Sequence, residues 1–479
     1  MAKLKIVLLV LVLLLGFILR LYKFNGPIAD WHSWRQSDTS SVSRSFVKDG
    51  FDILHPRFHD LSSTPTGRDN PQGYRFVEFP IYNILQAASF EAFGIFSLEE
   101  WGRLVTIFSS TLSSLFIYLI VKKRAGFTAG IFSAAFFSLL PYSIYYGRVI
   151  LPDPSMSASI LGGIYFFDKW IENPSLRRVS LIFFAGSLIL TAVALLLKPF
   201  AIFFTIPMIY LAVKKFGRKS FKSPYLWVFV VLTLLPLVLW RVWMTQFPEG
   251  IPHNTWLFNE GNIRFKGSFF YWIFADRVGR LILGYWGIAI FIFGFFAKFK
   301  KEDFLFFLSF ILSSLLYLFV VARGNVQHDY YQILILPTVA IFMGLGTNFL
   351  LRSARDFSSK YVGPGVFIVS FVFCLMFSWY FIRDYYNINN PAIIKVGQEA
   401  NRVIPEGSKV IAPYGGDTSF LYQTKRSGWP VFDRSLPELI DAGAGYLILL
   451  NPTIGELKDF GIYETISEGS DFVIFKLVQ

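Results

Sequence analysis

The chain has 479 residues, of which 54% are hydrophobic and only 16% are charged. Soluble domains carry about 25% charged residues, so this composition excludes an ordinary soluble enzyme and indicates a protein that crosses a membrane many times. The formal net charge of +13 comes from short basic segments between apolar runs, a placement that argues against nucleic-acid binding.

The first predicted element is an apolar helix. Residues 6–19 follow Lys3 and Lys5, which is also the pattern of a signal peptide. No clear small-x-small cleavage motif follows and more apolar runs come later, so we expect an uncleaved helix over about 4–24. Ten further spans bring the expected number to about eleven, at about 101–121, 126–147, 152–170, 180–197, 199–213, 224–244, 278–297, 303–322, 330–351 and 361–382.

The distribution of basic residues predicts how these spans are oriented. With a cytoplasmic N-terminus, every basic segment falls in a cytoplasmic loop, and the opposite span ends are poorer in Lys and Arg. The positive-inside rule therefore favours an inside N-terminus and an outside C-terminus. The basic segments lie within 122–125, 169–179, 214–223, 298–302 and 352–360.

Three substantial segments then lie outside. The first, 25–100, contains a short apolar stretch at 79–94, which suits an interfacial helix better than a crossing. The second is 245–277. In the third, 384–479, helix-like and strand-like stretches alternate, which predicts a small α/β domain. We therefore expect a polytopic α-helical membrane domain over 1–383 and an extracytoplasmic α/β domain over 384–479.

The stretch ADWHSWRQSDTSSVSR, residues 29–44, follows the first predicted helix directly. Asp30 and Asp38 have two interpretations. Both can be solvated loop carboxylates that pair with Arg35 or Arg44. Alternatively, shielding by the neighbouring tryptophans gives one of them a pKa suited to proton abstraction.

A second candidate site is YYGRVILPDPSMS, residues 145–157, where two apolar spans meet. Pro152 and Pro154 flank Asp153, so the carboxylate is expected to project from a turn. Asp153 can instead cap the next helix, which Asp does well. Capping does not explain Arg148, five residues earlier.

Two more predicted outer span ends carry candidate residues. Lys198 can bind a ligand, or its charge can simply reach toward the membrane surface. In RGNVQHDYYQILILP, residues 323–337, His328 and Tyr331 lie just before an apolar helix, although an aromatic belt also explains the tyrosines.

Alternating topology places all four candidate sites on the same outer face. Acids and scattered cations at the membrane surface suit a substrate with an anionic head and an apolar tail. No Walker loop, HExxH or GxSxG motif is present, and the single cysteine, Cys374, excludes an internal disulfide and a cysteine metal cluster.

Together these segments resemble the GT-C membrane glycosyltransferases. The acidic first outer loop, the FP segment at 79–80, YYGRVILPDP and HDYYQILILP occur in the order and on the sides expected of that class. More narrowly, the chain resembles the bacterial relatives of protein O-mannosyltransferases and of the lipid A aminoarabinose transferase, over about residues 1–350. It implies a polyprenyl-phosphate-linked sugar donor, inverting transfer, and a GT-C core followed by an outer C-terminal domain.

Two positions depart from the pattern of those relatives. Where relatives often have an adjacent Asp-Glu pair early in the first loop, this chain has Arg35 and Gln36, and Asp38 follows shortly after. Where relatives can have a phosphate-binding Lys before the FP segment, this chain has Glu78.

The resemblance implies a role for each candidate residue. Asp38 would be the catalytic base and Asp153 a second catalytic carboxylate that orients the acceptor or balances charge, with Asp30 as the alternative base. The substrate-binding residues would be Asp30, His32, Trp34, Arg35, Arg148, Lys198, His328 and Tyr331.

The expected partners are a polyprenyl-phosphate sugar donor, an acceptor hydroxyl on a lipid, glycan or protein, and membrane lipids, with no nucleic acid. No cofactor is required. The carboxylates and His328 can hold a divalent cation, but the spacing of a dedicated metal site is absent. Two other functions fit less well: a flippase or transporter of a lipid-linked sugar, and a polymerase or ligase of surface polysaccharide. A transporter would place ionisable residues along the spans, whereas these concentrate at span ends.

Overall fold

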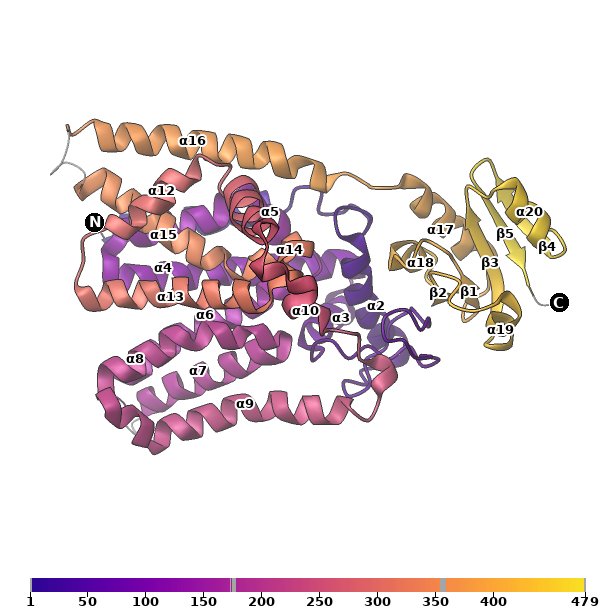
Figure 1. Ribbon diagram of the computed structural model, residues 1–479, viewed down its shortest axis with the longest axis horizontal. Helices are drawn as coiled ribbons and strands as arrows, with labels where there is room; N and C mark the ends of the chain where they lie inside the picture. Colours follow the sequence, from indigo (N-terminus) through magenta and orange to yellow (C-terminus); the bar gives the residue numbers. More distant parts are fainter. Residues whose placement is uncertain (1, 173, 175–177, 354–358, 478–479) are drawn as a thin grey trace. The chain divides into compact units, whose positions relative to one another are not determined.

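The computed structural model describes residues 2–172, 174, 178–353 and 359–477 (Figure 1). Parts of the predicted basic loops 169–179 and 352–360 lie outside the described residues. The chain forms two compact units. Unit 1 comprises 1–24, 103–239 and 254–384, and unit 2 comprises 25–102, 240–253 and 385–479.

Unit 1 is helical throughout its described residues. Two long helices cross the unit boundary, α4 at its start and α9 at its end. The helices are α1 (Ala2–Leu19), α4 (Leu98–Leu139), α5 (Pro141–Tyr146), α6 (Asp153–Glu172), α7 (Arg178–Leu197), η1 (Pro199–Thr205), α8 (Ile206–Phe216), η2 (Gly217–Lys222), α9 (Pro224–Met244), α10 (Trp256–Asn259), η4 (Glu260–Phe265), α11 (Gly267–Phe270), η5 (Tyr271–Ile282), α12 (Gly287–Phe293), η6 (Gly294–Phe296), α13 (Lys301–Val320), α14 (Ala322–Gln327), η7 (Asp329–Leu334), α15 (Leu336–Asn348), η8 (Phe349–Ser353), α16 (Val362–Ile382) and η10 (Arg383–Tyr386).

Among the described residues, six helices are long and apolar enough to cross a membrane, or seven if one bent pair forms a single span. This confirms a helical protein with several apolar spans, whereas the count of eleven stays a prediction. The difference has local causes. Helix α6 carries charged residues at both ends, and α15 has only 13 residues because the 3-10 helix η7 occupies the beginning of its predicted span.

The bent pair differs from the straight span predicted at 278–297. It consists of 267–282 and 287–296, which meet at 108°. The chain turns at Gly284 and Tyr285, where φ is +49° and +59°. A Cβ atom at Gly284 would lie 2.5 Å from the carbonyl oxygen of Cys374, so glycine also allows the turn to pack closely on α16.

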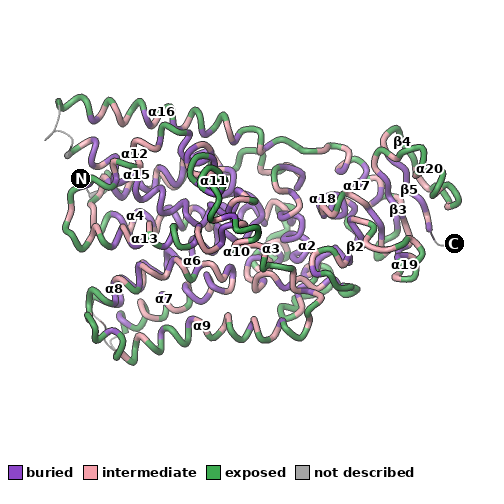
Figure 2. Tube along the Cα trace, in the orientation of Figure 1, coloured by how far each residue is buried: buried purple, intermediate pink, exposed green. Residues whose placement is uncertain are grey.

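Exposure differs strongly between the apolar helices of unit 1 (Figure 2). The most apolar window of α4 is 56% buried, whereas that of α9 is only 17% buried. Exposed Leu, Val and Trp side chains along α9 are expected where a helix faces lipid.

Unit 2 combines the first predicted outer loop with the C-terminal region. Residues 33–49 form a helix, α2, rather than the expected loop, and the short apolar stretch forms α3. The elements are α2 (Ser33–Asp49), α3 (Ile81–Phe93), η3 (Pro248–Gly250), α17 (Pro391–Val403), β1 (Lys409–Ile411), α18 (Thr418–Gln423), β2 (Ser427–Trp429), α19 (Leu436–Asp441), β3 (Ala444–Leu450), α20 (Ile454–Phe460), β4 (Glu464–Gly469) and β5 (Phe472–Lys476).

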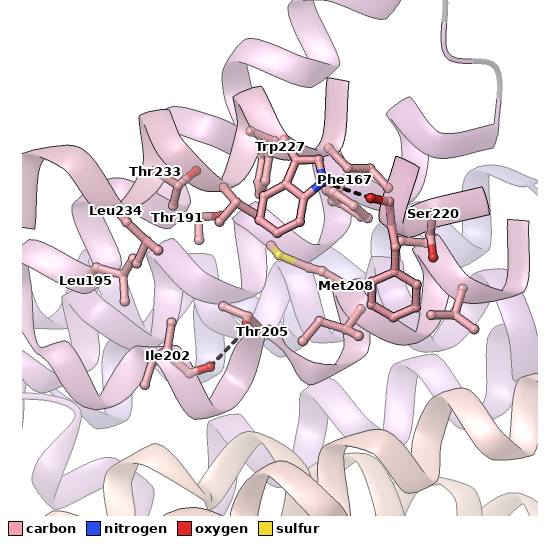
Figure 3. Close-up of a pocket in the computed structure, with 17 residues that line it drawn as sticks. Phe167, Thr191, Leu195, Ile202, Thr205, Met208, Ser220, Trp227, Thr233 and Leu234 are labelled. Atoms are coloured by element: carbon pink, nitrogen blue, oxygen red, sulfur yellow. Dashed lines mark hydrogen bonds between the residues drawn. The ribbon is translucent and has the colours of Figure 1, made fainter. Parts of the chain in front are cut away.

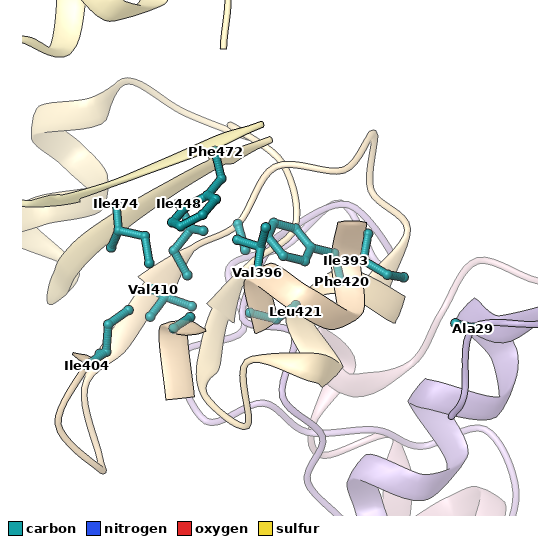
Figure 4. Close-up of a cluster of buried hydrophobic side chains, with 12 residues drawn as sticks. Ala29, Ile393, Val396, Ile404, Val410, Phe420, Leu421, Ile448, Phe472 and Ile474 are labelled. Carbon is teal, nitrogen blue, oxygen red and sulfur yellow. The ribbon is translucent and has the colours of Figure 1, made fainter. Parts of the chain in front are cut away.

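The C-terminal region forms a five-stranded mixed sheet in the order β2-β1-β3-β5-β4, which confirms the predicted α/β character. Strand β1 is parallel to β2 and β3, and β5 is antiparallel to β3 and β4. Side chains from the sheet and from α17 and α18 share one core (Figure 4). They include Val396, Val410, Phe420, Ile448 and Ile474.

A short piece of the first outer segment extends this sheet. Asp60 forms a parallel bridge with Gly428 of the edge strand β2. The amide of Gly428 donates to the carbonyl of His59 at 2.9 Å, and the amide of Leu61 donates to the carbonyl of Gly428 at 2.8 Å. The edge strand is therefore paired rather than open.

Candidate functional site

In unit 2, helix α2 buries Asp38 and places it between two partners from distant parts of the chain. Arg75 donates to Asp38 Oδ2 at 2.7 Å, and Thr418 Oγ1 donates to Oδ1 at 2.7 Å. Neither partner is identifiable from the sequence, since Thr418 lies 380 residues from Asp38. Asp38 is thus a buried, paired carboxylate, and the solvated-loop interpretation is wrong for it.

Asp30 is also buried, so the solvated-loop interpretation fails there as well. Gln36 Nε2 donates to Asp30 Oδ1 at 2.7 Å. His32 has a left-handed backbone conformation, with φ at +56°, and immediately precedes α2. The ring of Trp31 stacks on Tyr385 at 4.9 Å between centroids, while the carbonyl of Trp34 accepts from Thr418 Oγ1 at 3.2 Å.

The two departures from the glycosyltransferase pattern meet in the structure. Arg35 Nη2 donates to Glu78 Oε1 at 2.5 Å, and both side chains are largely buried, at 8% and 15% exposure. Arg35 and the acid that precedes the FP segment therefore form an ion pair. The Glu78 carboxylate is not an unpaired charge, because Arg35, the other residue that departs from the pattern, balances it.

Two titratable groups that the sequence analysis did not single out lie beside this cluster. Burial lowers the pKa of His59 from 6.5 to about 4, and burial raises the pKa of Asp60 from 3.8 to about 7. The Asp38 charge acts on both groups and opposes the burial effect at His59. His59 Nε2 lies 3.1 Å from the carbonyl oxygen of Thr418, and the amide of Ser62 donates to Asp60 Oδ1 at 2.8 Å.

Helix α18 contributes a second contact with α2. Arg44 Nη1 donates to the carbonyl of Tyr422 at 2.9 Å, and the Arg44 guanidinium lies 3.7 Å from the centre of the Tyr422 ring. The Tyr422 hydroxyl donates to Glu99, and burial raises its pKa. The same helix thus supplies Thr418 to Asp38 and Tyr422 to Arg44.

In unit 1, the central feature is an ion pair between Asp153 and Lys198. Lys198 Nζ donates to Asp153 Oδ1, and both side chains are buried, at 8% and 0% exposure. Asp153 is the first residue of α6 rather than a turn residue, so the prediction of a projecting carboxylate is wrong. Its Oδ2 atom has no hydrogen-bond partner among the described residues, so helix capping does not explain it either.

The remaining predicted residues of unit 1 are held by aromatic contacts. Lys198 Nζ lies 4.7 Å from the centre of the Tyr331 ring, and the His328 ring stacks on Tyr331 at 5.9 Å. Arg148 Nη1 donates to the carbonyl of Lys23 at 3.1 Å. Asp329, in the same stretch as His328 and Tyr331, accepts from the Tyr146 hydroxyl at 2.7 Å.

The described residues contain no group of three or more His, Cys, Asp or Glu side chains that could hold a metal ion. The carboxylates of the two clusters instead have cationic or hydroxyl partners, as in the Asp38–Arg75 and Asp153–Lys198 pairs.

Comparison with known proteins agrees with the fold. Residues 78–243 match the family model of dolichyl-phosphate-mannose-protein mannosyltransferases. No curated protein matches the sequence. The chain is similar to ArnT from Cupriavidus metallidurans bound to undecaprenyl phosphate, with 14% identity, a TM-score of 0.68, and coverage of 100% of this chain and 99% of ArnT.

A second similar structure is archaeal oligosaccharyltransferase AglB from Archaeoglobus fulgidus, in complex with an inhibitory peptide and a dolichol-phosphate. It shows 11% identity and a TM-score of 0.61, and the match covers 93% of this chain and 69% of AglB. Such identities establish the fold rather than the substrate. They confirm the resemblance drawn from the motifs: the chain has the GT-C fold of membrane glycosyltransferases.

Proposed function

We propose that the protein is a glycosyltransferase that moves a sugar from a polyprenyl-phosphate donor to an acceptor hydroxyl, with inversion at the anomeric carbon. The observation that carries this proposal is the full-length fold similarity to ArnT, whose structure holds undecaprenyl phosphate. The match of residues 78–243 to a mannosyltransferase family model supports the same reaction class. The acceptor is a protein, a lipid A molecule or another glycan.

In this proposal, unit 2 supplies the base. Asp38 takes the proton of the acceptor hydroxyl while that oxygen attacks the anomeric carbon and the bond to the lipid phosphate breaks. An ionised carboxylate has about four lone-pair positions, and Asp38 uses two of them for Arg75 and Thr418. It can therefore still accept a substrate proton. Asp30 is the alternative base.

Three further residues are proposed to stabilise the departing phosphate. Lys198, Arg148 and His328 offer the cations and the N–H donor that an oxyanion requires, and loss of one such donor can cost about 3 kcal/mol. Asp153 holds Lys198 in place through their buried ion pair. His32, Trp34, Arg35 and Tyr331 complete the proposed substrate contacts.

The proposed location is a bacterial-type inner membrane, with a cytoplasmic N-terminus and the reaction on the outer side. The alternation of basic loops supports this orientation. A reporter fused after residue 384 should then be read outside, and one placed within 214–222 should be read in the cytoplasm.

The function is tested in liposomes that contain the purified protein and polyprenyl-phosphate sugars labelled in the sugar. Transfer predicts labelled acceptor together with an equal amount of free polyprenyl phosphate. A transporter would move the intact donor to the other leaflet without releasing polyprenyl phosphate, and that result would overturn the proposal. Mass spectrometry of surface glycans from a deletion strain then identifies the sugar and the acceptor.

A further inference from the structure

Unit 1 contains an apolar cavity that the proposed reaction does not use (Figure 3). Its volume is about 410 Å³, within the range of small-molecule sites. Helices α6, α7, α8 and α9 and the short η1 and η2 helices form its walls. Phe167, Leu195, Met208, Trp227 and Leu234 are among the lining residues.

The polar groups that line the cavity are mostly engaged within the protein. Thr191 Oγ1 donates to the carbonyl of Ser187 at 2.7 Å, and Trp227 Nε1 donates to that of Phe221 at 2.9 Å. Thr233 Oγ1 is an exception, with no partner among the described residues. Such a lining offers little to a sugar or a nucleotide, whereas it suits a hydrocarbon chain.

The rim of the cavity is basic. Helix η2 contributes Ser220 and Phe221 to the lining, and Arg218, Lys219 and Lys222 beside them are exposed without an ion pair among the described residues. Nearby cations are already engaged: Lys214 with Glu302 at 2.7 Å, and Lys215 with the carbonyl of Glu172 at 2.7 Å. Three uncompensated positive charges thus adjoin an apolar cavity.

The basic end of the cavity lies away from the cluster proposed to hold the donor phosphate, whereas another lining residue, Leu195, is only three residues before Lys198. Phe167, which lines it, is 14 residues along α6 from Asp153, about 21 Å at 1.5 Å per residue. The basic rim belongs to the same end of the helices as Phe167. The distance approaches the thickness of a membrane hydrocarbon core, about 30 Å, so a donor head group at Lys198 would not reach this rim.

We propose that this cavity binds an anionic glycerophospholipid. One acyl chain occupies the apolar cavity, and the lipid phosphate lies against Arg218, Lys219 and Lys222. The apolar lining retains the chain, and the rim charges select an anionic head group over a zwitterionic one. The head-group position is separate from the Lys198 cluster of the proposed transfer reaction, and the bound lipid belongs to the opposite membrane surface.

The test compares lipid binding to the detergent-purified full chain by native mass spectrometry and titration, without any turnover. The probes are phosphatidylglycerol, phosphatidylcholine with the same acyl chains, and polyprenyl phosphate. The parent protein should retain one phosphatidylglycerol and prefer it at least about tenfold. Removing two charges in Lys219→Gln/Lys222→Gln should abolish this preference, because basic residues near the membrane surface attract anionic lipids.

Matched variants separate the site from general effects. Val230→Trp fills the cavity and should weaken retention of both phospholipids, whereas Val231→Trp alters a neighbouring residue of α9 that does not line it. Lys300→Gln/Lys301→Gln removes two charges elsewhere and should leave the preference intact. Thermal melting of each variant excludes unfolding as the cause.

Three results would overturn the proposal. The two phospholipids could bind equally to the parent, or the rim and cavity variants could bind like their controls. Polyprenyl phosphate could also displace phosphatidylglycerol at equal concentration, which would assign the cavity to the donor. Because binding is measured without turnover, failure of the proposed transfer reaction would not affect any of these readings.

Discussion

Asp38 in unit 2 and Asp153 in unit 1 are both buried carboxylates beside one cation, yet their surroundings differ. Asp38 binds Arg75 through one oxygen and Thr418 through the other. Asp153 binds Lys198 through one oxygen, and its second oxygen has no hydrogen-bond partner among the described residues. A buried polar atom without a partner is uncommon and is often found where a ligand binds.

The difference shows that burial and ion pairing alone do not identify a catalytic carboxylate. Asp38 has partners that hold its position, whereas Asp153 has unused accepting capacity in apolar surroundings. The proposed roles, Asp38 as base and Asp153 as the group that holds Lys198, can be separated by substitutions at each site.

The largest effect is expected for Asp38→Asn, which removes the proposed base while keeping the shape of the side chain. Turnover should fall by about 10²–10⁴-fold, the usual contribution of general base catalysis. Labelled-sugar transfer measures this loss, and Asp52→Asn, an exposed carboxylate in the same segment, serves as the control. If the variant keeps more than about a tenth of the parental turnover, Asp38 is not the base, and the comparison then turns to Asp30 and Asp153.

The next effect concerns the ion pair that secures α2, the helix that carries Asp38. Arg35→Glu or Glu78→Arg alone should destabilise the protein by about 3–5 kcal/mol, because each leaves like charges in a largely buried position. The double swap should recover most of this loss in thermal melting. Lys395→Glu, at an exposed pair, should change the melting temperature little. Additive single effects would show that the pair does not couple.

Lys198→Gln tests the unit 1 side of the comparison. Turnover should fall about 10²-fold if Lys198 stabilises the departing phosphate. The change also leaves Asp153 buried without its cation, so the Lys198→Gln/Asp153→Asn variant is needed to restore the melting temperature. That double variant should melt like the parent and stay slow. Recovery of turnover together with stability would show that Lys198 acts only as a structural partner of Asp153.

The smallest expected effect is a dependence of protein stability on pH, which arises from two groups in unit 2. Asp60 has its pKa raised by burial from 3.8 to about 7, so its contribution to stability falls as pH rises through that range. His59 has its pKa lowered by burial from 6.5 to about 4, so its contribution rises with pH between those values. In the parent protein, stability changes with pH in opposite directions at Asp60 and His59 between about pH 4 and 6.5, so the two effects largely cancel.

Single variants should expose each slope. In Asp60→Asn, the remaining His59 should make stability rise with pH by up to about 1.4 kcal/mol per unit from pH 4 to 6.5. In His59→Gln, the remaining Asp60 should make it fall by a similar amount per unit up to pH 7. Thermal melting across pH measures both, and slopes of the same sign would contradict the assignment.

Much of the fold follows from local patterns in the sequence. The apolar runs predict most of the long helices, and the C-terminal alternation predicts α17 at 391–403 together with strands that include β3 and β5. The bend at Gly284 was not predictable, because an apolar run does not show where glycine allows a tight contact with α16. Helix α2 was also missed, since its polar, serine-rich sequence is stabilised by tertiary contacts.

The sequence likewise predicts one part of the candidate site and not the other. The charged candidates were visible because acids and cations are unusual at the ends of apolar runs. Their partners were not, since Arg75 and Thr418 look like ordinary residues until folding brings them to Asp38. The pairing of Arg35 with Glu78 was likewise invisible, although both positions had been noted as departures. Local sequence identifies charges, whereas contacts over long sequence separations determine what those charges do.

The pairing of the first outer segment with edge strand β2 also determines when this segment can finish folding during synthesis. Gly428 and Thr418 are made long after His59 and Asp38, and Thr418 follows Asp38 by 380 residues. At synthesis rates of about 5–20 residues per second, the earlier segment waits about 20–80 s for its partners. During that interval Asp38 lacks the hydroxyl of Thr418, and the backbone of 59–61 lacks its strand. The first outer segment of the nascent chain therefore stays without these contacts until Thr418 and Gly428 have been made.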